Sequence, residues 1–120
     1  MSVKHSKDVE VKNVAAGKGT TIQVVISSQE GPNFAMRKYC IQPEGGIPRH
    51  TNTVEHEQYV LRGEATITID DEICHVKAGD VVFIPEGAIH SYQNTGDEPF
   101  EFLCIIPNKE DKLTIVEEAC

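Results

Sequence analysis

Apolar and polar residues alternate along most of this chain, and that alternation restricts the possible folds more than any other feature. Alternating runs rich in β-branched and aromatic residues cover residues 21–27, 34–42, 58–61, 65–70, 81–84, 90–93, 100–106 and 113–116. A period of two is that of a half-buried β-strand, and no segment carries the 3.6-residue stripe of an amphipathic helix. Turn-forming residues fill the connections, as at 43–46 and 94–97. The pattern predicts an all-β fold, an antiparallel sandwich or barrel.

The length of 120 residues suits one domain, so we treat residues 1–120 as a single unit. A chain of this size buries roughly two-thirds of its unfolded surface, enough for a core without disulfide bonds. It has four cysteines, Cys40, Cys74, Cys104 and Cys120. None lies in a C-x-x-C pair, and we expect Cys40 and Cys74 to act as small hydrophobic residues. We expect the polar residues 1–12 to be loosely ordered or exchanged between subunits.

The charge balance excludes several classes of partner. Eleven Lys and Arg face 19 Asp and Glu, for a formal net charge of −8. Such a chain repels phosphate backbones and anionic lipid, so we expect no nucleic-acid or membrane partner. No apolar run approaches the roughly 18 residues of a membrane helix, and residues 1–12 lack the apolar core of a signal peptide. We therefore expect a cytoplasmic protein.

Three of the five histidines stand out by their spacing. We expect His5 and His75 to be surface residues, because both lie among polar neighbours. A first-row metal needs several neutral imidazoles at about 2.0–2.2 Å, which requires ligands on one face of neighbouring strands. His50 and residue 52 share a face, and a turn through 53–55 is expected to return His56 on the adjacent strand. His90 would come from a distant strand.

The spacing around these histidines resembles the two sequence motifs of the cupin family. In the first motif, residues 45–63, the family pattern is Gly, five residues, His-x-His, three or four residues, Glu, six residues, Gly. Here the corresponding positions hold Glu44, His50, Asn52, His56 and Gly63. The second motif, residues 79–94, is met at every interval by Gly79, Pro85, Gly87, His90 and Asn94. The resemblance implies a double-stranded β-helix, the jelly-roll barrel of the cupins, with Glu44 as a loop variation.

The resemblance also implies one divalent transition metal per chain, which could be Mn, Fe, Zn, Ni or Cu. His56 stands where the family has Glu, as in small single-domain cupins with four-His manganese sites. The implied ligands are His50, Asn52, His56 and His90. Asn52 either offers its carbonyl oxygen or stands back and leaves three histidines. A barrel that has lost its metal and kept its glycines and prolines is the alternative.

The alternation of side chains along each strand indicates which residues should line the pocket. Gln58 shares a face with His56, Tyr92 shares one with His90, and residues 100, 102, 104 and 106 share another. Parity does not decide between Arg37 with Tyr39 and Met36 with Lys38, but the family resemblance favours Arg37, which would bind an anionic group. The expected pocket residues are Arg37, Gln58, Tyr92, Phe102, Cys104 and Ile106. We expect no inward Asp or Glu beside the ligands.

These features favour a metal-dependent oxidoreductase that acts on a small molecule, dioxygenase-like or peroxide-using. One alternative is a non-redox isomerase in which the metal is a Lewis acid. The other is a module that binds or senses a small ligand without turnover, because a fold alone does not decide function. Resemblance to small cupins implies a homodimer.

Overall fold

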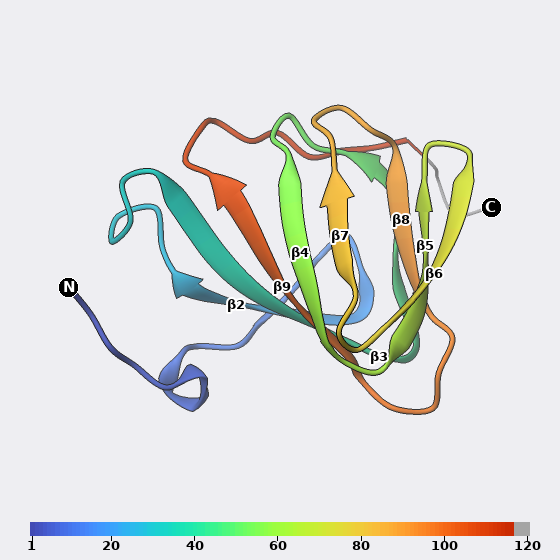
Figure 1. The fold of residues 1–120 in the computed structure, drawn as a ribbon, viewed down its shortest axis with the longest axis horizontal. Helices are drawn as coiled ribbons and strands as arrows, with labels where there is room; N and C mark the ends of the chain where they lie inside the picture. The colour runs from blue at the N-terminus through green and yellow to red at the C-terminus, as the bar shows by residue number, and fades with distance from the viewer. Residues whose placement is uncertain (117–120) are drawn as a thin grey trace.

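The computed structural model describes residues 1–116, and almost all of its regular structure is β-strand (Figure 1). Its elements are a short 3₁₀ turn at Ser6–Asp8 and the strands β1 (Lys12–Asn13), β2 (Lys18–Ile26), β3 (Phe34–Thr51), β4 (His56–Arg62), β5 (Glu64–Ile69), β6 (Glu72–Lys77), β7 (Val81–Ile84), β8 (His90–Asn94), β9 (Phe100–Pro107) and β10 (Thr114–Ile115). Among these residues no helix is long and apolar enough to cross a membrane.

The strands pair in antiparallel fashion in the order β6-β5-β8-β3-β9-β4-β7, with β2 and β10 added to β3 and β1 added to β2. This sheet curls so that β5, β6 and β8 face β4, β7 and β9 across a shared interior (Figure 1). The predicted all-β jelly-roll barrel is confirmed. Antiparallel strands curled this way bury one face and leave the other in solvent, which explains the alternation in the sequence.

The two halves of the barrel are joined by β3, which runs without a break for 18 residues. Its first part pairs with β2 and β9, and its last part, from Gly46 to His50, pairs with β8. The predicted turn at 43–46 is therefore a bend inside a strand. A side chain at Gly46 would collide with the Tyr92 carbonyl oxygen, so glycine lets the strands approach. Glu44 lies inside β3 at this bend, so the interpretation of Glu44 as part of a loop is wrong, and its φ of 69° is one that glycine, the family residue, adopts more easily.

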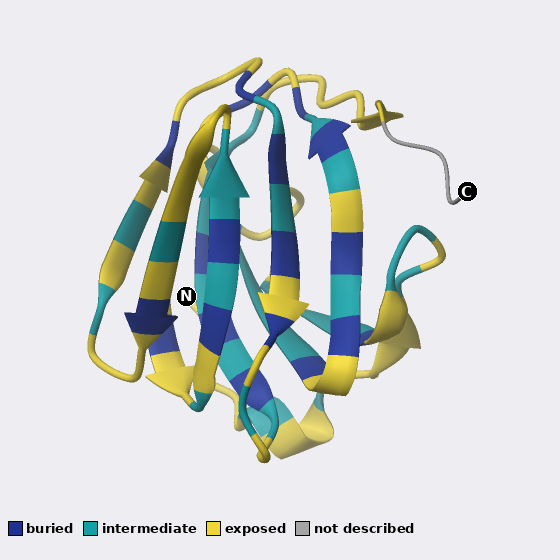
Figure 2. Ribbon diagram, turned by 90° about the vertical axis from the view of Figure 1, so that its right-hand side faces the viewer, coloured by how far each residue is buried: buried dark blue, intermediate teal, exposed yellow. Residues whose placement is uncertain are grey.

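Burial along the strands follows the predicted parity (Figure 2). On β4, His56, Gln58 and Val60 are buried while Tyr59 is exposed. On β9, Phe100 and Phe102 are buried. The apolar core consists of Ile41, Ile47, Val60, Ala65, Ile67, Val76, Ile84, Ala88, Tyr92, Phe100, Phe102 and Cys104. The core fills the barrel up to the end where the histidines lie.

The N-terminal segment lies against β2. The Gln23 side chain donates hydrogen bonds to the carbonyl oxygens of Ser6 and Val9, at 2.7 and 3.0 Å. Lys4 forms an ion pair with Glu30 at 2.7 Å. Exchange of residues 1–12 between subunits stays a prediction.

Among the described residues, Cys40, Cys74 and Cys104 are free thiols, and Cys40 and Cys74 are partly buried on strands. Cys120 lies outside the described residues. The exposed His5 and His75 are surface residues, as predicted.

A candidate metal centre at one end of the barrel

Three connections meet at the upper end of the barrel in Figure 1: residues 52–55 after β3, residues 85–89 after β7, and the segment that follows β9. The Gly87 amide donates to the Asn52 carbonyl at 2.8 Å, and the Thr53 amide donates to the Asp111 carboxylate at 3.1 Å. Beneath them is a cavity of about 260 Å³. Its lining residues are Val14, Arg37, Tyr39, Ile47, His50, Asn52, His56, Gln58, His90, Tyr92, Phe102, Asp111 and Leu113.

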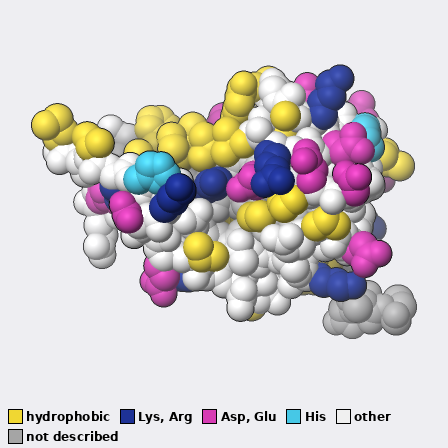
Figure 3. Space-filling view, turned by 90° about the horizontal axis from the view of Figure 1, so that it is seen from below, with side chains coloured by type: hydrophobic (Ala, Val, Ile, Leu, Met, Phe, Trp, Pro, Cys, Tyr) yellow, Lys and Arg dark blue, Asp and Glu magenta, His cyan; other side chains and the backbone are white. Residues whose placement is uncertain are grey.

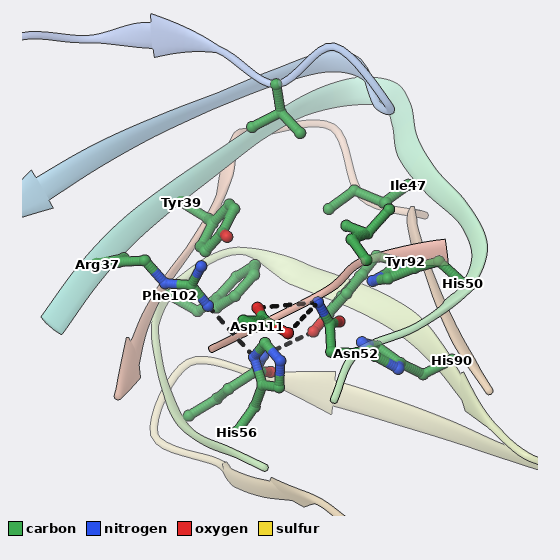
Figure 4. Close-up of a pocket in the computed structure, with 13 residues that line it drawn as sticks. Arg37, Tyr39, Ile47, His50, Asn52, His56, His90, Tyr92, Phe102 and Asp111 are labelled. Atoms are coloured by element: carbon green, nitrogen blue, oxygen red, sulfur yellow. Dashed lines mark hydrogen bonds between the residues drawn. The ribbon is translucent and has the colours of Figure 1, made fainter. Parts of the chain in front are cut away.

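His50, His56 and His90 come together in this cavity from three different strands (Figure 4). All three are buried. The ring centres of His50 and His90 are 4.1 Å apart, and those of His56 and His90 are 5.7 Å apart. The expectation that His56 returns on the strand beside His50 is wrong. His50 pairs with His90 on β8, and β4 pairs with β7 and β9 across the barrel, so residues 52–55 cross between the two halves.

Hydrogen bonds fix which ring nitrogen of two histidines carries the proton. The Nδ1 atom of His50 lies 2.8 Å from the Pro48 carbonyl oxygen, and that of His90 lies 3.0 Å from the Ala88 carbonyl oxygen. A carbonyl oxygen only accepts, so each Nδ1 donates and each Nε2 keeps a lone pair. Metal-binding histidines are oriented by bonds of this kind. The Nε2 atoms of His56 and His90 are buried without a hydrogen-bond partner.

The same burial keeps the imidazoles neutral. It lowers the pKa of His56 to about 3, with further lowering by Arg37 and the other two histidines. Burial also lowers the pKa of His90 to about 4 and moves that of His50 in the same direction. A charged imidazole loses its hydration when buried, which disfavours the protonated form. At neutral pH all three rings have a lone pair available, as metal binding requires.

Asn52 adds a third unpartnered atom to this cavity. Its Nδ2 donates to both carboxylate oxygens of Asp111, at 3.3 and 3.4 Å, while its Oδ1 is buried with no partner. In Figure 4 the Asn52 amide lies between Asp111 and the ring of His90. The expectation that no inward Asp or Glu lies beside the ligands is wrong. Asp111 reaches the cavity through the path of the chain after β9, and it lies between the alternating runs at 100–106 and 113–116, where no pattern marks it.

The donor set fits a divalent transition metal. Across residues 1–116, no group of three or more His, Cys, Asp or Glu side chains is arranged so that it could hold a metal ion without rearrangement. Three neighbouring ligand atoms nevertheless lack partners, namely the Nε2 atoms of His56 and His90 and the Oδ1 atom of Asn52. Leaving a buried polar atom unpaired costs about 1–3 kcal/mol, so native proteins rarely leave three together. Imidazole nitrogens with an amide oxygen suit first-row divalent ions.

Arg37 lines the cavity on the side of His56 (Figure 4). The sequence did not decide whether Arg37 with Tyr39 or Met36 with Lys38 points inward, and in the structure Arg37 and Tyr39 do. Its Nη2 donates to the Cys104 sulfur at 3.4 Å and also lies 3.4 Å from His56 Nδ1, while its Nε is buried without a partner. Among the described residues no carboxylate forms an ion pair with it. A partly buried guanidinium that lines a cavity without an ion-pair partner is suited to binding an anion.

Three aromatic rings stack along the same side and form what we call the aromatic wall: Tyr39, Phe102 and Tyr92. Phe102 is in the middle, 5.0 Å from the Tyr39 ring centre and 5.3 Å from that of Tyr92, with planes inclined by only 11° and 12°. The Gln58 amide donates to the Tyr92 hydroxyl at 2.6 Å and holds that ring in place. The aromatic wall gives the cavity an apolar surface with a few polar groups, as is usual for small-molecule sites.

Residues 37–106 match the family described as the cupin domain. The chain is a cupin. The oxalate-binding protein of Thermotoga maritima is 31% identical over 100 residues, which are 80% of this chain and 83% of that protein. Gentisate 1,2-dioxygenase of a Ralstonia species is 31% identical over 65 residues, 53% of this chain and 18% of that enzyme. The solved structure of the polyketide cyclase RemF from Streptomyces resistomycificus matches 99% of this cupin and 87% of that chain, with 27% identity and a TM-score of 0.90.

Two of the expected pocket residues of this cupin lie elsewhere. Cys104 is behind His56, with its sulfur 3.0 Å from His56 Nδ1, and does not line the cavity. Ile106 lies in a shallow groove beside Ala35 and Pro107, so its assignment to the cavity is wrong. A strand advances about 3.3 Å per residue, which puts Ile106 roughly 13 Å beyond Phe102. The expected set lacked five lining residues, of which only Ile47 lies in a motif: Val14, Tyr39, Ile47, Asp111 and Leu113.

Proposed function

We propose that this cupin binds one divalent transition metal through the Nε2 atoms of its three clustered histidines and Oδ1 of Asn52. The observation that carries the proposal is the set of three buried, unpartnered ligand atoms around one cavity. When bound, such a metal supplies a Lewis acid and, if it is redox-active, a partner for electron transfer. With a six-coordinate metal such as Mn²⁺ or Fe²⁺, four neutral protein ligands would leave positions open for a small molecule.

The substrate that we propose is a small planar anion. Arg37 would bind a carboxylate or an enolate-type oxygen, because its guanidinium faces the cavity without an ion-pair partner. The aromatic wall gives the cavity an apolar side, against which a conjugated or aromatic group would pack. At about 260 Å³ the cavity lies just below the range of roughly 300–1,000 Å³ that drug-sized ligands occupy. A molecule with a single ring, or a smaller one such as oxalate, fits this volume.

The reaction we favour is that of a dioxygenase-like oxidoreductase. This reaction is supported by the apolar residues that line the cavity beside the proposed ligands, because they would limit the access of water and so its side reactions. Similarity to gentisate 1,2-dioxygenase adds support. In this reaction Arg37 and the aromatic wall bind and orient the substrate, and the neutral histidines hold the metal.

A second candidate, a non-redox isomerase or cyclase, is favoured by Asp111. Its carboxylate lines the cavity and is the acidic group that the sequence reasoning found missing. In such a reaction Asp111 would hold a proton taken from the substrate while a Lewis acid polarises a carbonyl group. Similarity to the polyketide cyclase RemF supports this candidate.

One experiment separates these candidates. Protein loaded with Mn²⁺, Fe²⁺ or Zn²⁺ is incubated with oxalate and a panel of hydroxylated aromatic acids, and oxygen consumption and product mass are measured together. Oxygen uptake with an oxidised product supports the oxidoreductase. A product of unchanged mass, or one that has lost only water, formed without oxygen uptake supports the second candidate. Saturable binding without turnover supports a binding module, as similarity to an oxalate-binding protein would suggest. Binding that is identical with and without metal would contradict the proposal.

We also propose a homodimer formed through the outer face of β4 and β7. Figure 3 shows a band of hydrophobic side chains on the surface seen from below. Tyr59, Leu61, Val81 and Phe83 are exposed on these two strands, and Tyr59 pairs with Val81. Exposed apolar residues in a contiguous patch usually mark an interface. Light scattering that reports about 13 kDa at micromolar concentration, the mass of one chain, would contradict the dimer.

A further inference from the structure

We infer that Asp111 is a positioning residue of the metal centre, and that the segment after β9 closes over the cavity as the metal binds. We call residues 108–116 the strap. This inference rests on the proposed metal site, and it concerns how the protein builds that site. Asp111 would act through Asn52, by holding the amide in the one orientation that gives the metal an oxygen.

The strap is fastened at its start to residues 31–33, where the Asn108 amide donates to the Asn33 carbonyl oxygen at 3.0 Å, and from residue 110 onward to residues 49–53 beside the ligands. β10, inside the strap, pairs with β3 so that Thr114 lies opposite Thr51 and Ile115 opposite His50. The Val116 amide donates to the Arg49 carbonyl at 3.0 Å.

Thr53 fastens the middle of the strap. Its hydroxyl donates to the Glu110 carbonyl at 3.1 Å and accepts from the Lys112 amide at 2.8 Å. Together with Asp111, which accepts from the Thr53 amide, these bonds keep the strap within reach of Asn52. Anything that orders residues 50–53 therefore also orders the strap.

The orientation of the Asn52 amide decides whether it can bind a metal. With Nδ2 toward Asp111, as found, Oδ1 is left facing away from the carboxylate, buried and without a partner. Turned by 180°, the amide would direct Oδ1 at a carboxylate, which cannot donate, and Nδ2 toward His90, whose Nε2 would accept from it. The turned amide would occupy the lone pair that a metal needs. Asp111 disfavours this competing state.

Asp111 also makes metal binding and strap closure interdependent. If the closed strap favours the binding orientation of Asn52, then metal binding must favour the closed strap by the same factor. A partner that orients a metal ligand typically changes metal affinity by about 10- to 100-fold. The Asn52–Asp111 contacts are long, at 3.3–3.4 Å, and Asp111 is exposed on its outer side, so we expect an effect near tenfold.

The test measures Co²⁺ affinity by competition with a chelator, together with hydrogen exchange of the strap. Asp111→Ala should weaken Co²⁺ binding about tenfold, and Asp111→Asn should weaken it less, because the new amide oxygen still accepts from Asn52. Glu110→Ala is the matched control. It removes the same charge from the strap but keeps the backbone carbonyl that Thr53 uses, so it should bind Co²⁺ like the wild type.

Two further measurements separate positioning from general destabilisation. In the wild type, Co²⁺ should slow hydrogen exchange at the Lys112 and Val116 amides, and in Asp111→Ala this protection should fall. In an Asn52→Leu background, Asp111→Ala should have no further effect on Co²⁺ affinity, because the residue through which it acts is gone.

Several results would overturn the inference. The first is an Asp111→Ala protein that binds Co²⁺ as tightly as the wild type. The second is a Glu110→Ala protein whose Co²⁺ affinity falls as much as that of Asp111→Ala. The third is a loss of Co²⁺ affinity on Asp111→Ala that is equally large in the wild-type and Asn52→Leu backgrounds. A wild-type protein that does not bind Co²⁺ would instead refute the proposed metal site itself. Thermal unfolding of each variant shows that it is folded under the assay conditions.

Discussion

The metal-free protein should lose stability in mild acid because of its buried histidines. The pKa of His56 is about 3 and that of His90 about 4 in the folded chain, against an ordinary value of 6.5. The folded values lie below the unfolded one, so the unfolded chain takes up protons first as the pH falls. Stability should therefore be fully present above pH 6.5 and should decline from there toward pH 4.

The size of this loss follows from proton linkage. Below pH 6.5, each histidine that stays neutral only in the folded state costs about 1.4 kcal/mol per pH unit. Between pH 7.5 and 5.0 this amounts to about 2 kcal/mol for His56 and the same for His90. The lowered pKa of His50 acts in the same sense. A total near 4 kcal/mol is a large share of the roughly 5–15 kcal/mol that stabilises a domain.

Urea unfolding of chelator-treated protein at pH 7.5 and 5.0 measures this loss, and a variant isolates the contribution of one ring. His90→Asn keeps a donor for the Ala88 carbonyl but removes the titrating group, so its loss between the two pH values should be smaller by about 2 kcal/mol. The exposed His75→Gln serves as the control and should match the wild type. Comparison between variants cancels the effect of the many carboxylates. An identical loss in His90→Asn and wild type would refute the reasoning.

Three further predictions concern single residues of the site. Arg37→Gln should raise the KM for an anionic substrate at least tenfold with a smaller change in kcat, as steady-state kinetics would show, because Arg37 binds and does not react. Cys104→Val should weaken Co²⁺ binding and Cys104→Ser should not, in chelator competition, because the Cys104 sulfur lies 3.0 Å from His56 Nδ1 and, by accepting its proton, would leave Nε2 with a lone pair for the metal. Asn52→His should tighten metal binding roughly tenfold in the same chelator competition, because imidazole is a better ligand for first-row metals than an amide oxygen.

The strands and the histidine cluster could be predicted because they depend on local sequence patterns. A period of two places His56, Gln58 and Val60 on one face whatever the rest of the fold does. The expectation for β7 at 81–84 agrees with the structure residue for residue. The second motif also has a physical basis, since Gly79 and Gly87 have positive φ and the Asn94 side-chain oxygen accepts from the Gly96 amide at 2.8 Å.

What could not be predicted depends on how distant segments meet. The bend at 43–46 has the composition of a turn, yet pairing with β2, β8 and β9 on either side keeps β3 continuous. Asp111 follows the last core strand, in a segment whose position is set by backbone bonds to β3 and by Thr53. Such contacts leave no periodic pattern in the sequence. The parity of Arg37 was likewise undecided until its pairing with Cys104 was known.

Metal content is the most direct test of the metal centre at His50, Asn52, His56 and His90. The protein is purified without added metal, and its metal-to-protein ratio is determined by mass spectrometry beside that of a His50→Ala/His90→Ala variant. Our account predicts about one transition-metal ion per chain in the wild type and a nearly metal-free double variant, because three ligands are the minimum for a stable site of this kind. A double variant with full metal content would contradict it.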